Sequence, residues 1–137
     1  MLTVLLLAAQ AQTVTEIREG QARALREPFE RVIRSKEAWE ELWKKLDPDS
    51  GERKPLLPEV DFAKESVVAI AWGERPSAGW DLEVKAVRIE GGEAVVEVVR
   101  RPPTGVALTV ITYPYLLVKT RRLPEKVRFV DVPPPVK

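Results

Sequence analysis

The fold is decided by residues 67–90, which read VVAIAWGERPSAGWDLEVKAVRIE. Six consecutive apolar residues, Val67 to Trp72, are typical of a strand that is buried on both faces. A loop with two glycines and a proline follows at 73–79, and then residues 80–86 alternate as a strand with one solvated face does. We therefore expect these two strands to pair as a hairpin whose loop projects from a rigid base, the usual position of binding residues.

The segments that follow continue a β-rich pattern. Past Trp80 the alternation changes phase, and a β-bulge near Ala86 would reconcile the two halves of that strand. Gly91 and Gly92 form a two-residue hairpin signal, because both accept positive φ, and Ala94–Arg101 is the next strand. Pro114 cannot donate to a strand ladder, so we expect a sheet edge, a bulge or a bend there. Further extended stretches are expected at 106–112, 116–120 and 126–132.

One helix is expected upstream of these strands. Ser35 is a candidate N-cap for a helix over about 36–46, which Asp47-Pro48 would end. Its apolar residues recur at helical spacing and form one stripe: Trp39, Leu42, Trp43 and Leu46. Such a stripe serves either as core packing or as a ligand platform, and the burial of two indoles favours packing against a sheet. Two short strands are expected at 13–18 and 28–33.

These patterns predict an α+β fold that is mainly antiparallel β. We expect a meander sheet curled into a small sandwich or open barrel, with the amphipathic helix of residues 36–46 packed on it. The length of 137 residues corresponds to one domain, and 45% apolar with 31% charged residues is typical of soluble globular chains. The expected domain covers residues 12–132, and a proline-rich tail covers 133–137.

Composition argues against an enzyme. The sequence has no cysteine and no histidine, which excludes disulfides and thiol nucleophiles and removes the commonest general base and metal ligand. A Ser–Lys pair or paired carboxylates would remain, but no lysine lies within a few residues of Ser77. No spacing requires acids such as Glu74 and Asp81 to converge. We therefore expect no catalytic residue, no metal site and no cofactor.

The net charge and the residue composition limit the possible partners and indicate the kind of source organism. A net charge of +1 argues against a nucleic-acid partner, since phosphate binding needs a basic face. No apolar run is long enough to predict a transmembrane span. The absence of asparagine, the single methionine and the 12 prolines are typical of a protein from a thermophile.

Residues 1–11, MLTVLLLAAQA, have two interpretations. A short apolar core followed by Ala9-Gln10-Ala11 fits the remnant of an export signal, although no basic residue precedes it. The alternative is a β-strand that continues into residues 13–17. The first interpretation predicts a periplasmic or extracellular protein, and the second leaves a cytoplasmic location open.

Strand order makes a prediction about the loops. In an antiparallel hairpin series, every second connection lies at the same end of the sheet. The loops at 73–80 and 101–105 should therefore lie side by side, with the Gly91-Gly92 turn at the far end. Arginine and tryptophan are enriched at the dominant contact points of interfaces. The residues expected to bind a partner are Arg75, Pro76, Ser77, Gly79, Trp80, Arg101, Pro102, Pro103, Tyr113, Pro114 and Tyr115. The alternative is a pair of proline-stiffened turns with solvated arginines.

The same residues resemble a known family. Gly73-Glu74-Arg75-Pro76-Ser77-Ala78-Gly79-Trp80, after a hydrophobic strand, resembles the G-x-x-P-[TS]-x-G-aromatic motif of the PrcB-type, protease-complex-associated C-terminal domain. Pro102-Pro103, Tyr113-Pro114-Tyr115 and Val127-Arg128-Phe129 are similar to later elements of that domain, whose core would cover about 60–132. Ser77 and Trp80 replace the usual threonine and tyrosine. The loop also resembles, more loosely, the loops of chagasin-like protease inhibitors.

The resemblance implies an exported, non-catalytic module. It would associate with and stabilise a partner protein such as a surface or periplasmic protease. One alternative is a protease inhibitor that acts through the paired loops 73–80 and 101–105. The other is a purely structural domain.

Overall fold

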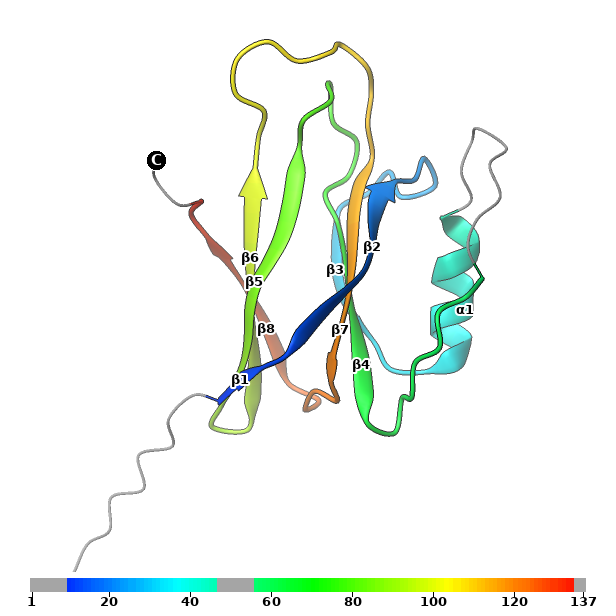
Figure 1. Cartoon of the computed structure of the whole chain (residues 1–137), viewed down its shortest axis with the longest axis vertical. Coiled ribbons are helices and arrows are strands. Elements are labelled where there is room, and N and C mark those ends of the chain that lie inside the picture. The colour runs from blue at the N-terminus through cyan, green and yellow to red at the C-terminus, as the bar shows by residue number, and fades with distance from the viewer. Residues whose placement is uncertain (1–9, 47–55, 135–137) are drawn as a thin grey trace, which may run out of the picture.

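The structure, a computed structural model, describes residues 10–46 and 56–134. Within them the chain forms one helix and eight strands arranged in three layers (Figure 1). Most of the predicted export signal (residues 1–9), the turn at Asp47-Pro48 and the last three residues of the tail lie outside the described residues.

The strands form two open four-stranded sheets. The first sheet has the order β1-β5-β6-β8, with the bounds Gln10–Gln12, Asp81–Glu90, Glu93–Arg101 and Val127–Val132. The second sheet has the order β2-β7-β4-β3, with the bounds Val14–Gln21, Pro114–Arg121, Glu65–Ala71 and Phe29–Ile33. Neither sheet closes on itself, so the predicted β-rich fold is confirmed in its sandwich form and not as a barrel.

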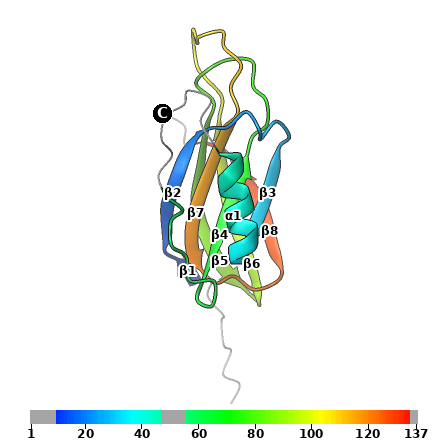
Figure 2. The same cartoon turned by 90° about the vertical axis from the view of Figure 1, so that its right-hand side faces the viewer.

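The predicted helix is confirmed as α1, Lys36–Lys45. The Ser35 hydroxyl accepts a hydrogen bond from the Ala38 amide at 3.2 Å, which satisfies one of the free amides of the first turn. The buried face of α1 carries Trp39, Leu42 and Trp43 and packs on the outer face of the second sheet (Figure 2). The tryptophans are therefore core residues and not a ligand platform.

Strand β4 is the centre of the molecule. Val67, Ala69 and Ala71 face the core under α1, whereas Val68 and Ile70 face the core between the two sheets. All five residues are fully buried, at 0% exposure. The continuous apolar run in the sequence is thus explained by burial on both faces, as predicted.

The predicted hairpin between β4 and β5 is wrong. β4 pairs with β3 and β7 in the second sheet, while β5 lies in the first sheet. Residues 72–80 therefore cross from one sheet to the other instead of closing a hairpin. The alternation of apolar residues shows that a segment is a strand and which face is buried, but it does not specify the neighbouring strand.

Two other expectations of a simple meander are also wrong. β8 pairs with β6 in parallel, with Ala94 opposite Val127 and Val99 opposite Val132. Residues 106–112 form no strand apart from an isolated bridge between Arg75 and Thr112. The hairpin of β5 and β6 around Gly91-Gly92 is confirmed, as is the bulge, which lies between Val84 and Ala86.

Pro114 occupies the first position of β7, opposite Gln21 of β2. β7 is an interior strand, between β2 and β4, so Pro114 marks neither an edge nor an interruption. A proline is tolerated at the first residue of a strand because the ladder does not depend on its missing amide hydrogen there.

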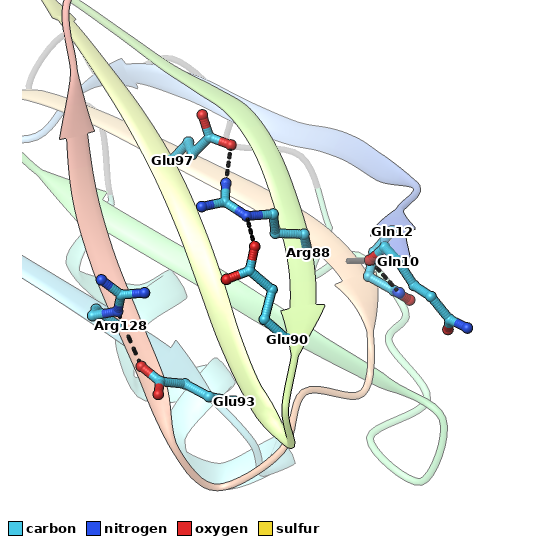
Figure 3. A network of polar contacts seen from close by, with 7 residues as sticks. All are labelled: Gln10, Gln12, Arg88, Glu90, Glu93, Glu97 and Arg128. Atoms are coloured by element: carbon cyan, nitrogen blue, oxygen red, sulfur yellow. Dashed lines mark hydrogen bonds and ion pairs between the residues drawn. The ribbon is translucent and has the colours of Figure 1, made fainter. Parts of the chain in front are cut away.

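The outer face of the first sheet carries several ion pairs. Arg88 of β5 bonds to Glu90 at 2.5 Å and also to Glu97 of β6, and Arg128 of β8 bonds to Glu93 of β6 at 3.1 Å (Figure 3). Two of these ion pairs join neighbouring strands, and Arg88–Glu90 lies within β5. The same face also holds Val95 and Val99 of β6, which are at most 1% exposed. Within the described residues, no helix has the length and apolar character that crossing a membrane requires.

The packing of α1 gives a stability prediction. Trp39 is 1% exposed, and its Nε1 donates a hydrogen bond to the Pro58 carbonyl at 3.0 Å. Trp39→Ala should lower the free energy of unfolding by about 3–5 kcal/mol, because it leaves a large cavity. Guanidinium unfolding followed by circular dichroism measures this. The control, Glu41→Ala on the exposed face, should change stability by less than about 0.5 kcal/mol, and equal losses for both variants would contradict docking of the helix.

Candidate functional site

Two loops project together from one end of the sandwich, and we call this region the loop end. It comprises residues 72–80 and 102–112, which extend beyond the strands at the top of Figure 1. The Ala78 amide donates to the Leu108 carbonyl at 3.0 Å, and Arg75 and Thr112 exchange backbone hydrogen bonds of 2.8 and 2.9 Å. The Thr112 hydroxyl donates to the Ser77 carbonyl at 2.7 Å. The loops therefore stabilise each other.

The β5–β6 hairpin brings the two loops together. Its turn at Gly91-Gly92 lies at the opposite end, so Asp81 at the start of β5 pairs with Arg101 at the end of β6. The chain enters β5 from the first loop and leaves β6 into the second loop. The predicted adjacency of the loops is therefore observed. The meander from which it was derived is not observed, but the β5–β6 hairpin alone is sufficient to bring the two loops together.

Gly79 is the point of closest approach between the loops. Its φ is 92°, and a Cβ placed on it would lie 2.8 Å from the Cβ of Pro103. Glycine is therefore required at position 79 for two reasons: the backbone has a positive φ, and Pro103 leaves no space for a side chain. The adjacent Pro76 is exposed, as is Pro102, whereas Pro103 is half-buried against the glycine.

The base of the first loop is an aromatic cluster. The rings of Trp72 and Trp80 meet edge to face, with centroids 5.2 Å apart and planes at 86°. The Arg75 guanidinium lies 4.7 Å from the centroid of Trp80, and Trp80 Nε1 donates to the Ser77 hydroxyl at 2.9 Å. Trp80 is half-buried. Its indole is thus held in one orientation with part of its surface exposed, which lowers the entropy cost of a contact.

The arginines of this region differ in their availability. Arg101 forms ion pairs with Asp81 at 3.7 Å and Glu83 at 2.7 Å, so its charge is already compensated. Arg75 donates from Nε to the Glu74 carbonyl at 2.9 Å, and among residues 10–46 and 56–134 no carboxylate forms an ion pair with it. Arg75 is therefore the better candidate to bind a carboxylate of a partner.

The structure does not place Tyr113, Pro114 and Tyr115 on the contact surface. All three are buried, with Tyr113 at 9% and Tyr115 at 3% exposure. The Tyr113 hydroxyl donates to Glu74 Oε1 at 3.1 Å, and the Tyr115 hydroxyl accepts from Arg18 Nε at 2.8 Å. They are core residues with satisfied hydroxyls, so the expectation that they extend the patch is wrong.

The most exposed part of the loop end lies outside the residues predicted to bind a partner. Four large aliphatic side chains of the second loop are exposed: Val106 at 104%, Leu108 at 76%, Val110 at 50% and Ile111 at 58%. The alternating sequence was interpreted as a strand. The sequence does indicate a loop here, because prolines flank the segment: Pro102-Pro103 precede it and Pro114 follows it. Prolines interrupt strand pairing and favour loops.

The chemistry of the loop end is set by its exposed side chains. Within residues 10–46 and 56–134, no cluster of three acidic side chains could hold a metal ion. The exposed groups of the loop end are aliphatic side chains, an indole edge, prolines and a guanidinium. Such groups bind other surfaces by burial of apolar area and by one charge contact.

The fold and this end define a helix-covered β-sandwich domain with two paired loops at one end. Residues 66–121 match the family described as PrcB C-terminal, which confirms the resemblance over this range. The matched range runs from β4 to β7 and contains both loops. No curated protein and no solved structure matches the chain.

The contact between Gly79 and Pro103 gives a prediction about stability. Gly79→Ala and Gly91→Ala both place a side chain on a residue with positive φ, 92° and 56° respectively. Only Gly79→Ala also creates a clash, since nothing lies within 4 Å of the added Cβ at Gly91. Gly79→Ala should therefore cost about 1–3 kcal/mol more than Gly91→Ala. Equal unfolding midpoints in guanidinium would contradict the close approach of the loops.

Proposed function

We propose that this domain is a non-catalytic binding module that associates with a partner protein through the loop end. The observation that carries the proposal is the exposure of Val106, Leu108, Val110 and Ile111 on a loop anchored by hydrogen bonds to its neighbour. Isolated exposed aliphatic residues are ordinary, but several within one projecting loop mark a contact surface.

The energetics are adequate for association. Full burial of an aliphatic side chain contributes about 1.5–3 kcal/mol. Four such side chains together are of the same order as the cost of association, about 4–15 kcal/mol. The Trp80 indole and the Arg75 guanidinium supply the further contacts that give affinity and orientation. The loop end thus contains the apolar centre and the charged neighbour of a small interface.

The proposed partner is an exported or surface protease, and the proposed location of the module is the periplasm or the cell exterior. The support is the PrcB C-terminal match together with what the PrcB-type resemblance implies. The interface requires a partner surface with an apolar depression for the second loop and a carboxylate for Arg75. Stabilisation of the partner is the proposed outcome.

Inhibition of a protease remains a second candidate, because both loops project from the same end, as an inserted inhibitor requires (Figure 1). Turnover distinguishes the two functions. A stabiliser raises the melting temperature of the protease and leaves its turnover intact, whereas an inhibitor lowers turnover at stoichiometric concentration.

Capture of the partner tests the proposed surface. The double variant Leu108→Asp and Val110→Asp should lower affinity for the partner protease at least about tenfold, because charges replace apolar contacts. Trp80→Ala with Arg75→Ala should act in the same direction. Leu56→Asp is the matched control, since Leu56 is 91% exposed but lies in the connector after α1.

The measurement is capture from envelope extract with identification of the retained protease, followed by titration of that protease. Circular dichroism verifies that each variant is folded. Capture that the loop variants leave unchanged, or that Leu56→Asp reduces equally, would contradict the loop end as the binding surface.

A further inference from the structure

A second surface lies on the side of the sandwich where β1 and β2 meet. β1 pairs with only the last part of β5, with Gln10 opposite Ile89 and Gln12 opposite Val87. The chain then leaves the first sheet at Thr13 and joins the second sheet as β2. Among the described residues, no strand pairs with the outer edge of β5 over Asp81–Ala86.

A groove follows this free edge. It lies between β5 and β2, with a volume of about 450 Å³, and continues into a smaller hollow of about 190 Å³ that ends at Trp80. Both hollows share Leu82 as a lining residue, and Leu116 and Val118 of β7 also line the larger one. These three side chains are at most 6% exposed and belong to the core between the sheets. The groove thus reaches the apolar core beside an unpaired strand edge.

The β2 side of the groove is acidic. Glu16 lines the larger hollow and Glu19 the smaller one, and both are exposed. Within the described part of the chain, neither forms an ion pair, whereas Asp81 and Glu83 on the β5 side are paired with Arg101. The negative charge of Glu16 raises the pKa of Glu19, and burial and Asp81 add to this effect. A cation in the groove would relieve this repulsion.

Within the described residues, neither Arg18 nor Lys85 forms an ion pair with these two acids. Arg18 of β2 lies 5.7 Å from the centroid of Trp43, on the face that α1 covers. Lys85 lines the groove at the β-bulge between Val84 and Ala86. The bulge disrupts the regular edge, which limits strand pairing to Asp81–Val84.

We propose that this groove binds an extended, basic peptide segment of another protein, which adds as a short strand to the Asp81–Val84 edge of β5. The side chains of the segment that face β2 would be Lys or Arg, with their charges beside Glu16 and Glu19 and their aliphatic stems on Leu82, Leu116 and Val118, because these five residues share the face between the sheets. The alternate side chains of the segment would face solvent. Recognition of this kind takes affinity from backbone hydrogen bonds and specificity from the alternating side chains.

The existing structure supports this occupant over a second copy of the chain. β1 already pairs with β5 in this manner, so the peptide would continue the line of β1 along the same edge. Two copies that paired through this edge would bring their uncompensated Glu16 and Glu19 side chains together. Like charges placed opposite one another are destabilising, so the charge of the groove favours a basic partner.

Two-dimensional NMR of the full chain tests the proposal. The probe is an acetylated and amidated heptapeptide that alternates lysine and valine, and the control peptide has glutamate in place of lysine. The lysine peptide should shift the amide signals of residues 81–84 and slow hydrogen exchange at the alternate amides of this range that point away from β6, because these edge amides gain partners. The glutamate peptide should not.

A charge-reversal pair tests the acidic wall. Glu16→Lys with Glu19→Lys should weaken binding of the lysine peptide about tenfold or more, since two attractive charges become repulsive. Glu27→Lys with Glu41→Lys is the matched control, because it changes the net charge equally at exposed positions that do not line the groove. Binding should also weaken as the pH falls through the raised pKa of Glu19, where protonation removes the charge.

Several results would overturn the proposal. One is the absence of shifts at residues 81–84 at saturating peptide, and another is equal binding of the glutamate peptide. Protection of β2 amides instead of β5 amides would refute the assigned edge. Dimerisation of the chain that is lost in Glu16→Lys with Glu19→Lys would assign the edge to a second copy. None of these outcomes depends on the loop-end variants, so the two surfaces are tested separately.

Discussion

The burial of β4 on both faces is the constraint on which the rest of the structure depends. A strand with Val67, Ala69 and Ala71 on one side and Val68 and Ile70 on the other needs an apolar cover on each side. The helix α1 supplies one cover and the first sheet supplies the other. Both edges of β4 are taken by β3 and β7, and the chain after Trp72 crosses to the first sheet, where it forms β5; the crossing forms half of the loop end.

The caps, turns and bulges that depend on a few neighbouring residues were predictable from the sequence. Ser35 as a cap, the tryptophan stripe of α1, the Gly91-Gly92 turn and the bulge beside Ala86 each follow from residue types at fixed spacing, and each is observed. The pairing of β4 with β7 and the parallel pairing of β6 with β8 join segments distant in sequence. No periodicity specifies such partners, because the same alternation fits any neighbour.

The candidate site was predictable in part for the same reason. The adjacency of the two loops requires only one hairpin, so it was obtained although the remaining strand order was wrong. The hydroxyls of the buried Tyr113 and Tyr115 bond to Glu74 and Arg18, which are far from them in sequence. The second loop has the composition of a strand. In the described structure, however, no strand lies beside Val106–Ile111 to pair with it. Its aliphatic residues therefore face solvent, which alternation alone does not reveal.

The loop end and the groove have opposite physical requirements, so the two proposed binding partners differ in chemistry. The loop end offers exposed aliphatic side chains and a guanidinium without a carboxylate partner in the described chain, so it suits a partner surface that supplies shape and an acid. The groove offers acids, a free backbone edge and access to the core, so it suits an extended chain that supplies amides and cations. The two meet at Trp80, which lies under Arg75 and also lines the end of the groove. A single partner that placed a folded surface on the loops and a basic tail along β5 would gain from both contacts, because the second contact is intramolecular once the first has formed.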